Sequence, residues 1–242
     1  MDVSTNWWET YFEGVAVTLW VHAVPPEASA REAGRIVHLL GLPPGAEILD
    51  VPCGAGRVAL ALAAAHDYHV TGVDWSEESL EHARAGDTAK AVIWERRDMR
   101  DLPWPARFDG AFCVGNSFGY LDDAGNVAFL RSVHDTLKPG GRFVLETPMI
   151  IENLLDHLQP RPWWKVGDVY LLVENQYDAA RSRLDIEYTF IADGRVDVRR
   201  GTHRAWSLKE MTDLLTDAGF AVALAEPWTR DAHMVTFIGT RE

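Results

Sequence analysis

Short apolar runs alternate with amphipathic segments between residues 46 and 147. The apolar runs predict strands at 46–51, 69–74, 91–97, 108–114 and 142–147. The segments between them have helical spacing and predict helices at 57–65, 77–85 and 124–137. Because such alternation is typical of a parallel sheet covered by helices on both faces, we predict a doubly wound α/β fold.

One more helix precedes this alternation. Ser29 and Glu32 have the spacing of a capping box, and apolar residues then recur at helical spacing as far as Leu40. The pattern predicts a helix that starts at Ser29 and is stopped by Gly41. Residues 1–28 are rich in aromatic side chains and have no clear period, so we expect an irregular N-terminal cap.

The alternation of strands and helices breaks after Thr147. Residues 168–206 have the period of an antiparallel meander, with apolar side chains on one face of the segment 184–190. Asp193-Gly194 is a strong hairpin signal inside this segment. An apolar sheet face needs a cover, so the meander either lies over a functional site or forms a dimer interface.

The chain closes with a helix and two strands. Ser207 and Glu210 repeat the capping-box spacing, and strand-like runs follow at 221–226 and 233–240. Together the patterns predict a mostly parallel seven-stranded sheet and one domain, 1–242. Its expected parts are a cap at 1–28, a core at 29–148, an inserted lid at 149–206 and a closing segment at 207–242.

Composition narrows the class of protein. The 242 residues include 23 Lys and Arg against 36 Asp and Glu, a net charge of −13 that repels phosphate backbones, so no nucleic-acid partner is expected. The longest apolar run, 58–65, is too short to span a membrane, and residues 1–4 do not start a secretory signal. Cys53 and Cys113 lack metal-binding spacing, which favours no metal site and a cytoplasmic location.

A glycine-rich turn follows the first predicted strand. Residues 48–57 read ILDVPCGAGR, in which Gly54 and Gly56 let the backbone approach a ligand at the start of a helix. The string from Gly54 to Ala59 also matches the dinucleotide fingerprint G-x-G-x-x-A. A nicotinamide enzyme therefore stays open at this point, as does a tight turn that binds nothing.

Polar residues end four of the predicted parallel strands. Asp74 lies 24 residues after Asp50, close to the spacing of an acid that holds a ribose diol. Trp75 beside it could lie against an adenine ring or pack between helix and sheet. Asp98 and the Met99 amide could contact an adenine edge. With Gly115-Asn116, these endings share the carboxyl edge of the sheet, where ligands bind.

These motifs, taken in order, resemble those of class I S-adenosylmethionine-dependent methyltransferases of the small-molecule type. ILDVPCGAGR, VTGVDWS, RRDMRDLPW, FDGAFCVGNSFGYL and LKPGGRFVLET are similar to the family's five successive motifs. The resemblance implies S-adenosylmethionine as cofactor, and it covers about residues 30–148. The cofactor-binding positions that it implies are Asp50, Gly54, Gly56, Asp74, Trp75, Asp98, Met99, Gly115 and Asn116. The sequence from Gly115 to Phe118 departs from the Asn/Asp-Pro-Pro-Tyr/Phe motif of the nucleobase and protein-amide branches.

The reaction that the resemblance implies is methyl transfer to an O, N or C nucleophile of a small molecule, with secondary metabolism as the expected setting. Position and water exclusion can supply most of the catalysis without a metal. His203, Glu146 and His233 are candidate bases, but the sequence assigns no catalytic residue. Four residues outside the shared core are candidates for acceptor binding, namely Tyr11, Phe12, Trp20 and His203. Phe118, within the core, is a fifth candidate.

Two alternatives from other classes stay open. One is an NAD(P)-dependent oxidoreductase built on the same glycine-rich fingerprint. The other is a non-catalytic module that binds the cofactor. In each case we expect a small-molecule ligand, no membrane partner and a monomer or homodimer.

Overall fold

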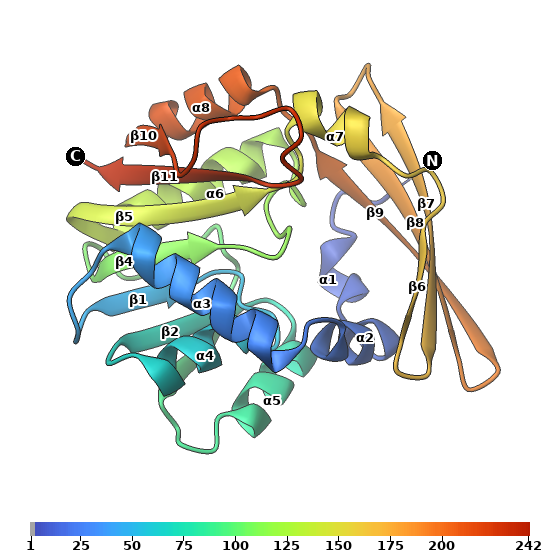
Figure 1. Ribbon diagram of the computed structural model, residues 1–242, viewed down its shortest axis with the longest axis horizontal. Helices are drawn as coiled ribbons and strands as arrows, with labels where there is room; N and C mark the ends of the chain where they lie inside the picture. Colours follow the sequence, from blue (N-terminus) through green and yellow to red (C-terminus); the bar gives the residue numbers. More distant parts are fainter. Residues whose placement is uncertain (1–2) are drawn as a thin grey trace.

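Two sheets face each other across the N-terminal helices (Figure 1). The computed structural model describes residues 3–242. Its strands are β1 (Glu47–Asp50), β2 (His69–Asp74), β3 (Val92–Arg96), β4 (Phe108–Cys113), β5 (Leu137–Thr147), β6 (Trp163–Val166), β7 (Val169–Asp178), β8 (Arg183–Ala192), β9 (Arg195–Arg204), β10 (Phe220–Leu224) and β11 (Val235–Arg241). Its helices are α1 (Trp8–Tyr11), α2 (Val15–Ala23), α3 (Pro26–Leu40), α4 (Arg57–Ala65), α5 (Glu77–Gly86), α6 (Asp123–Thr136), α7 (Ile151–His157) and α8 (Leu208–Asp217).

The larger sheet has seven strands in the order β10-β11-β5-β4-β1-β2-β3. The five strands from β5 to β3 are parallel, and β11 pairs antiparallel with both β5 and β10. The expected doubly wound, mostly parallel α/β fold is therefore confirmed. All five parallel strands end at the edge that faces the second sheet (Figure 1).

Helices cover both faces of this sheet, because its central strands are apolar on both sides. On β1, Ile48 belongs to the core beneath α3 and α4, which includes Ile36 and Leu62. The next residue, Leu49, belongs to the core on the opposite face, with Phe129 of α6. Continuous apolar strands are typical of a sheet buried on both faces.

The helix α3 begins earlier than the sequence pattern predicts. Pro25 is its N-cap in extended conformation, and Pro26 occupies the first turn, where a missing N–H costs nothing. Ser29 lies inside the helix and its hydroxyl donates to the Pro25 carbonyl, so the expected capping box at Ser29 is wrong. The second expected box is correct, since Ser207 caps α8 together with Glu210.

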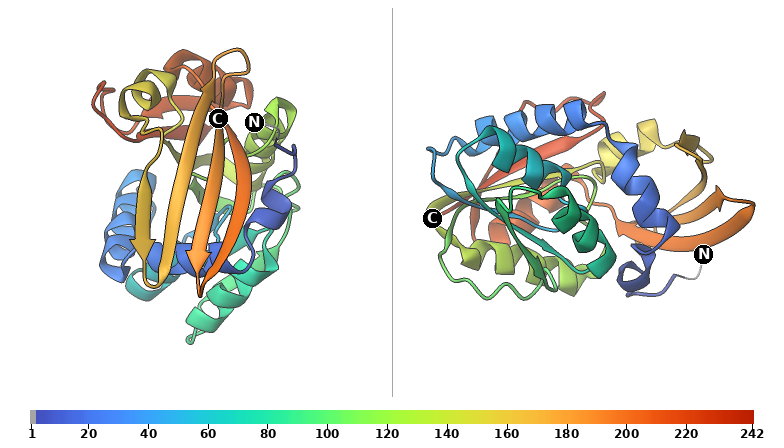
Figure 2. Two further views of the ribbon diagram at one scale, coloured as in Figure 1. Left: turned by 90° about the vertical axis from the view of Figure 1, so that its right-hand side faces the viewer. Right: turned by 90° about the horizontal axis from the view of Figure 1, so that it is seen from below.

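The N-terminal segment is more regular than its sequence indicates. It forms the two short helices α1 and α2, joined at Gly14, which has a φ of +53°. Residues 1 and 2 of the expected cap at 1–28 lie outside the described residues. Both helices lie between the sheets, where each buries one side, while residues such as Thr10 and His22 stay exposed (Figure 2).

The second sheet is the expected insertion after β5, and it has four strands in the order β6-β7-β8-β9. Asp193 and Gly194 form its β8–β9 hairpin with φ values of +51° and +71°, as a type I′ turn requires. Its inner face, which includes Leu171 and Phe190, shares one apolar core with the larger sheet. The outer face lies open to solvent in Figure 2 and exposes Leu172, with 43% of its surface accessible.

Two findings concern the expectations about membrane spans and cysteines. Among residues 3–242, no helix is long and apolar enough to cross a bilayer. Cys53 and Cys113 are both free thiols.

Candidate functional site

A pocket of about 610 Å³, measured with its open mouth, lies at the carboxyl edge of the larger sheet, a size usual for small-ligand sites. It is enclosed by strand ends from β1 to β4 and by the N-terminal cap. The lining residues are Trp8, Phe12, Pro52, Gly54, Val73, Asp74, Trp75, Ser76, Ser79, Arg97, Asp98, Met99, Ser117 and Tyr120. Five of the nine expected cofactor-binding residues are in this lining: Gly54, Asp74, Trp75, Asp98 and Met99.

Asp74 joins two walls of the pocket. Its carboxylate accepts a hydrogen bond from the Gly54 N–H at 2.7 Å and another from the Ser76 N–H at 2.8 Å. Burial raises the pKa of Asp74, and the two backbone hydrogen bonds offset part of this rise. The side chain thereby fixes the glycine-rich turn relative to β2 and keeps lone pairs for hydroxyl groups of a ligand.

Asp98 lines the pocket just after β3, the strand next to β2. Arg100 donates to both of its carboxylate oxygens, with Nε–O distances of 2.9 and 3.0 Å. Burial opposes ionisation of Asp98, but the hydrogen bonds from Arg100 outweigh it and lower the pKa. An ionised carboxylate next to Met99 can accept from an amine on a planar ring.

Aromatic rings form the remaining walls. Trp8 of the cap meets Trp75 edge to face, with ring centroids 5.6 Å apart. Phe12 and Tyr120 lie on the other side, 5.9 Å apart by their centroids. Such rings suit the faces of a flat heterocycle and also stabilise a nearby positive charge.

Asp50 and Gly56 are not among the residues that line the pocket. Burial raises the pKa of Asp50 well above its usual range, which the charge of Arg57 partly offsets. Gly56 has a φ of +74°, and a Cβ added to it would stand 2.3 Å from the Trp94 ring. Packing of Trp94 therefore requires glycine here. A Cβ on Gly54 would meet no atom within 4 Å. Of the two glycines in this turn, Gly54 is therefore the one that borders open space, in the lining of the pocket.

Gly115, Asn116, Phe118 and Trp20 do not line the pocket either. Gly115 and Asn116 follow β4 with φ values of +75° and +61°, and the buried Oδ1 of Asn116 has no partner. The Phe118 ring stacks on Trp206 in the core at 4.8 Å. Trp20 is exposed on α2, with 42% of its surface accessible.

Tyr11 and His203 belong to a second group of aromatic rings, next to the pocket. Trp7 lies between them, with centroid distances of 5.3 Å to Tyr11 and 5.6 Å to His203. Tyr120 of the pocket lining meets the His203 ring edge to face at 4.8 Å. We call Trp7, Trp8, Tyr11, Tyr120 and His203 the aromatic cluster. It joins the cap, the loop after β4 and strand β9.

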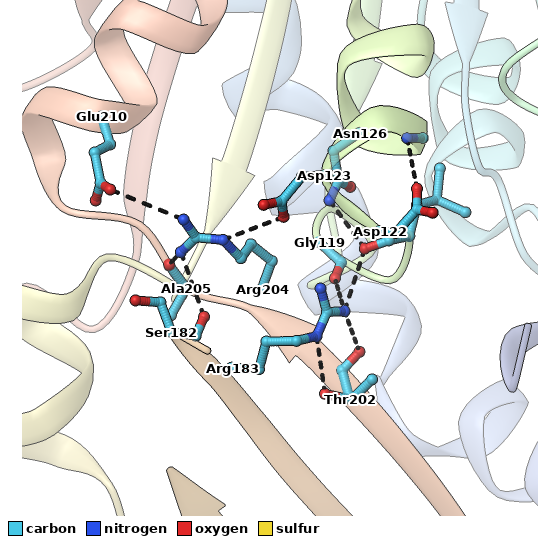
Figure 3. Close-up of polar contacts among 12 residues, drawn as sticks. Gly119, Asp122, Asp123, Asn126, Ser182, Arg183, Thr202, Arg204, Ala205 and Glu210 are labelled. Carbon is cyan, nitrogen blue, oxygen red and sulfur yellow. Dashed lines mark hydrogen bonds and ion pairs between the residues drawn. The ribbon is translucent and has the colours of Figure 1, made fainter. Parts of the chain in front are cut away.

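The second sheet holds the loop that carries Tyr120 (Figure 3). The Arg183 guanidinium donates to the carbonyls of Gly119 and Leu121, at 3.4 and 3.2 Å, on either side of Tyr120. The Arg204 N–H donates to the Gly119 carbonyl at 2.9 Å. These contacts tie one wall of the pocket to β8 and β9.

The other candidate bases have structural partners. Glu146 binds the guanidinium of Arg35 and accepts from the Thr236 hydroxyl at 3.2 Å. His233 lies against the His157 ring, with centroids 4.1 Å apart. No set of three or more His, Cys, Asp or Glu side chains within the described part of the chain could hold a metal ion.

Sequence reasoning missed several lining residues. Trp8 and Tyr120 lie close in sequence to expected residues, but their approach to the pocket depends on how the cap and the loop fold. Ser76 and Ser79 are at the start of α5, where the Ser76 hydroxyl caps the helix and gives a detectable signal. Pro52 follows the strand end at Asp50 and carries no polar group to mark it.

Residues 48–141 match the family model described as a methyltransferase domain. A 27-O-demethylrifamycin SV methyltransferase of Amycolatopsis mediterranei is 35% identical over 132 residues, which are 52% of this chain and 47% of the relative. The chain spans about half the length of the curated relatives it matches.

Solved structures match nearly the whole chain. The CcbJ methyltransferase of Streptomyces caelestis has a TM-score of 0.78 at 18% identity, over 96% of this chain and 98% of that one. CalS10, an amino pentose methyltransferase of Micromonospora echinaspora, has a TM-score of 0.72 at 22% identity, over 95% of this chain and 98% of that one.

The fold and the site thus define a Rossmann-like α/β protein with a ligand pocket at its strand ends. More particularly, residues 48–141 match the family of methyltransferase domains, which confirms the resemblance seen in the motifs.

Proposed function

We propose that this protein transfers a methyl group from S-adenosylmethionine to an O, N or C nucleophile of a small molecule. One observation carries the proposal: residues from three separate motifs, represented by Gly54, Asp74 and Asp98, line one pocket inside a methyltransferase domain. The relatives' names include methyltransferases of antibiotic biosynthesis, which favours a role in secondary metabolism.

The pocket suggests a role for each lining residue. Asp74 would accept hydrogen bonds from the ribose hydroxyls, and Asp98 from the adenine amine. Trp75 would cover the adenine face, with the Met99 amide at its edge. Gly54 leaves space for the methionine portion, and the buried carboxylate of Asp50, with Gly56, Gly115 and Asn116, lies toward that end of the sheet.

The chain's own contribution to the reaction is position and exclusion of water. Bound S-adenosylmethionine supplies an electrophilic methyl group on a sulfonium. The cap and the second sheet close over the strand ends, so an acceptor held there would be aligned with the methyl group in a dry site. The rings of Phe12, Tyr120 and Tyr11 offer the acceptor an apolar surface.

The family match and the named relatives favour this function over the oxidoreductase and the non-catalytic module. We further propose a cytoplasmic protein, monomeric or homodimeric, with no nucleic-acid substrate. The four-part domain map, 1–28, 29–148, 149–206 and 207–242, remains our working division of the chain.

Calorimetric titration tests the cofactor assignment. We expect S-adenosylmethionine to bind and Asp74→Ala to weaken binding by about 1.5–3 kcal/mol, because hydrogen bonds to a charged acceptor are lost. Asp101→Ala is the matched control, since Asp101 is exposed and outside the pocket lining. Melting curves of both variants identify any loss of fold.

Equal affinity of Asp74→Ala and the parent protein would remove Asp74 from the site. Binding of NADH in place of S-adenosylmethionine would support the oxidoreductase. Binding without any S-adenosylhomocysteine formed from a broad set of acceptors would favour the non-catalytic module.

A further inference from the structure

A groove between α6 and α8 has a strongly acidic lining. Its volume is about 630 Å³, measured with its open mouth, and it shares no residue with the pocket at the strand ends. Four acids and one arginine give the lining a net charge of −3. The lining residues are Asp123, Asn126, Val127, Arg204, Trp206, Glu210, Asp213, Leu214 and Asp217.

Three of these acids form a row along α8. Glu210, Asp213 and Asp217 follow one another at intervals of three and four residues, so they lie on the same side of the helix. Like charges at this spacing repel one another. The last turn of α8 also contains no basic residue, although the negative end of a helix dipole favours a cation there. A cation bound in the groove would offset both effects.

The protein itself supplies two cations to the groove. Arg204 lies between Asp123 and Glu210, at 3.3 and 3.8 Å (Figure 3). Lys209 reaches Asp213 at 2.5 Å, but both of these side chains are more than half exposed. Exposed ion pairs contribute little to stability, so an ammonium group of a ligand can replace Lys209 at low cost.

Two groups of the groove lack a partner within the part of the chain that the structure describes. Asp217 makes no side-chain hydrogen bond or ion pair there. Asn126 is 1% exposed, and its Oδ1 accepts no hydrogen bond. Its Nδ2 donates to the Leu121 carbonyl at 3.0 Å, which fixes the orientation of the amide. A buried carbonyl oxygen without a donor in the lining of a groove indicates a ligand that donates hydrogen bonds.

The arrangement of the lining favours an extended organic cation over a metal ion. Among residues 3–242, no three His, Cys, Asp or Glu side chains could hold a metal ion together. The helix rise separates the three acids of α8 by about 4.5 and 6 Å. A linear triamine with three and four methylene groups between its nitrogens has ammonium groups at similar intervals, and its charge balances that of the lining. Val127, Trp206 and Leu214 offer apolar surface to the methylene groups.

We propose that the groove between α6 and α8 binds a linear polyamine, whose ammonium groups pair with the three acids of α8 and donate to Oδ1 of Asn126. The groove is separate from the pocket in which the methyl group would be transferred. This inference therefore does not depend on the proposed function.

The groove lies behind the loop that carries Tyr120. Arg204 donates its backbone N–H to the Gly119 carbonyl at 2.9 Å, and Asn126 donates to the carbonyl of Leu121. Tyr120, between these two residues, lines the pocket at the strand ends. A polyamine that contacts Arg204 and Asn126 thus steadies one wall of the pocket without occupying it.

Three cations of different shape test the site. The full chain is titrated by calorimetry, in about 0.15 M salt, with spermidine, with the compact trication hexaamminecobalt(III), or with 1,8-diaminooctane, which has the length of spermidine but no central nitrogen. We expect one equivalent of spermidine to bind at least tenfold more tightly than either of the others. Equal affinities would mean diffuse attraction to the net charge of −13 and would overturn the proposal.

Variants test the place of binding. We expect Asp213→Asn combined with Asp217→Asn to weaken spermidine binding at least tenfold, because two of the three acids lose their charge. Glu81→Gln, at an exposed acid of α5 outside the groove, is the matched control and should bind within twofold of the parent protein. Melting curves show whether each variant folds. Should the double variant not fold, each single variant carries the test with an expected loss of at least threefold. Unchanged affinity overturns the groove as the site.

S-adenosylhomocysteine distinguishes the groove from the pocket, which has the acids Asp74 and Asp98 in its own lining. We expect a saturating concentration to lower the affinity for spermidine by no more than twofold. Competition between the two ligands would place the triamine in the pocket and overturn the inference. Failure of the parent protein to bind S-adenosylmethionine would overturn the proposed function instead.

Discussion

The two walls of the site satisfy their polar groups in opposite ways. At the carboxyl edge of the larger sheet, each carboxylate oxygen of Asp74 accepts a hydrogen bond from a backbone N–H, of Gly54 or of Ser76. Across the pocket, the aromatic cluster contains His203, whose two ring nitrogens are buried without a hydrogen-bond partner. One wall is therefore held in place by its own hydrogen bonds, whereas the other contains buried polar atoms that no protein group satisfies.

The difference is also one of construction. The first wall is made of strand ends, whose position follows from the parallel sheet itself. The second wall is assembled from the cap, a loop and a strand of the second sheet, and Arg183 joins two of these parts. A cofactor that is the same across a family is best held by a rigid wall, such as the strand ends. An acceptor that varies between proteins is best bound by a wall assembled from variable parts, such as the cap and the second sheet.

The largest expected effect distinguishes the two glycines of the first wall. Gly56→Val places a side chain against the Trp94 ring in a left-handed conformation, so we expect the free energy of unfolding to fall by about 3 kcal/mol or more. A Cβ on Gly54 meets no neighbour, but its φ of +54° disfavours a side chain, so we expect Gly54→Ala to lose about 1 kcal/mol of stability. It should then melt a few degrees below the parent protein and lose cofactor affinity. Thermal melts and calorimetry measure both; a stable Gly56→Val protein would contradict the packing explanation.

A smaller loss of stability is expected from a change at Arg183, which joins the second sheet to the loop that carries Tyr120. Arg183→Met removes hydrogen bonds from a charged group to the carbonyls around Tyr120, which should cost about 1.5–3 kcal/mol of stability and weaken cofactor binding. Arg200→Met is the control, because Arg200 makes an exposed ion pair with Glu187 on the same sheet. Urea unfolding and calorimetry measure the two readouts, and unchanged cofactor affinity would show that the loop keeps its place without Arg183.

The smallest effect concerns the pH dependence of stability. The pKa of His203 is about 3 in the folded protein, below its unfolded value near 6.5, so the unfolded chain binds the extra proton between these values. Stability from the neutral ring is present above pH 6.5 and is lost as the pH falls toward 3. We expect the parent protein to lose about 2 kcal/mol relative to His203→Phe between pH 8 and pH 5.

Urea unfolding of both proteins at pH 5, 6.5 and 8 measures this difference. A parallel decline of the parent protein and His203→Phe would mean that the ring is protonated in the folded state. His22→Ala, on the exposed side of α2, should follow the parent protein at each pH.

The first wall could be predicted from the sequence because its signals are local. Gly54 and Asp74 each follow an apolar strand, and the carboxyl ends of parallel strands meet at one edge. Asp98 and Met99 were found in the same way. The strand and helix pattern of residues 46–147 also agrees with the sheet, apart from β5, which begins at Leu137.

The second wall could not be predicted to the same extent, because its contacts are distant in sequence. Trp7 lies against His203 only after the insertion has folded back over the strand ends. Phe118 shows the converse: its place after β4 suggests the site, but its ring turns into the core. The sequence of the cap shows no helical period, because a four-residue helix such as α1 is too short to produce one.

The position of β11 has a consequence for the nascent chain. Because β11 lies between β5 and β10, the edge of β5 stays unpaired until residues 235–241 have been synthesised. Phe143, Val144 and Leu145 then form an apolar strand whose backbone can pair with another chain. The interval between synthesis of β5 and of β11 is therefore the period in which this protein is most open to aggregation, and a chaperone that covers one strand edge would suffice to protect it.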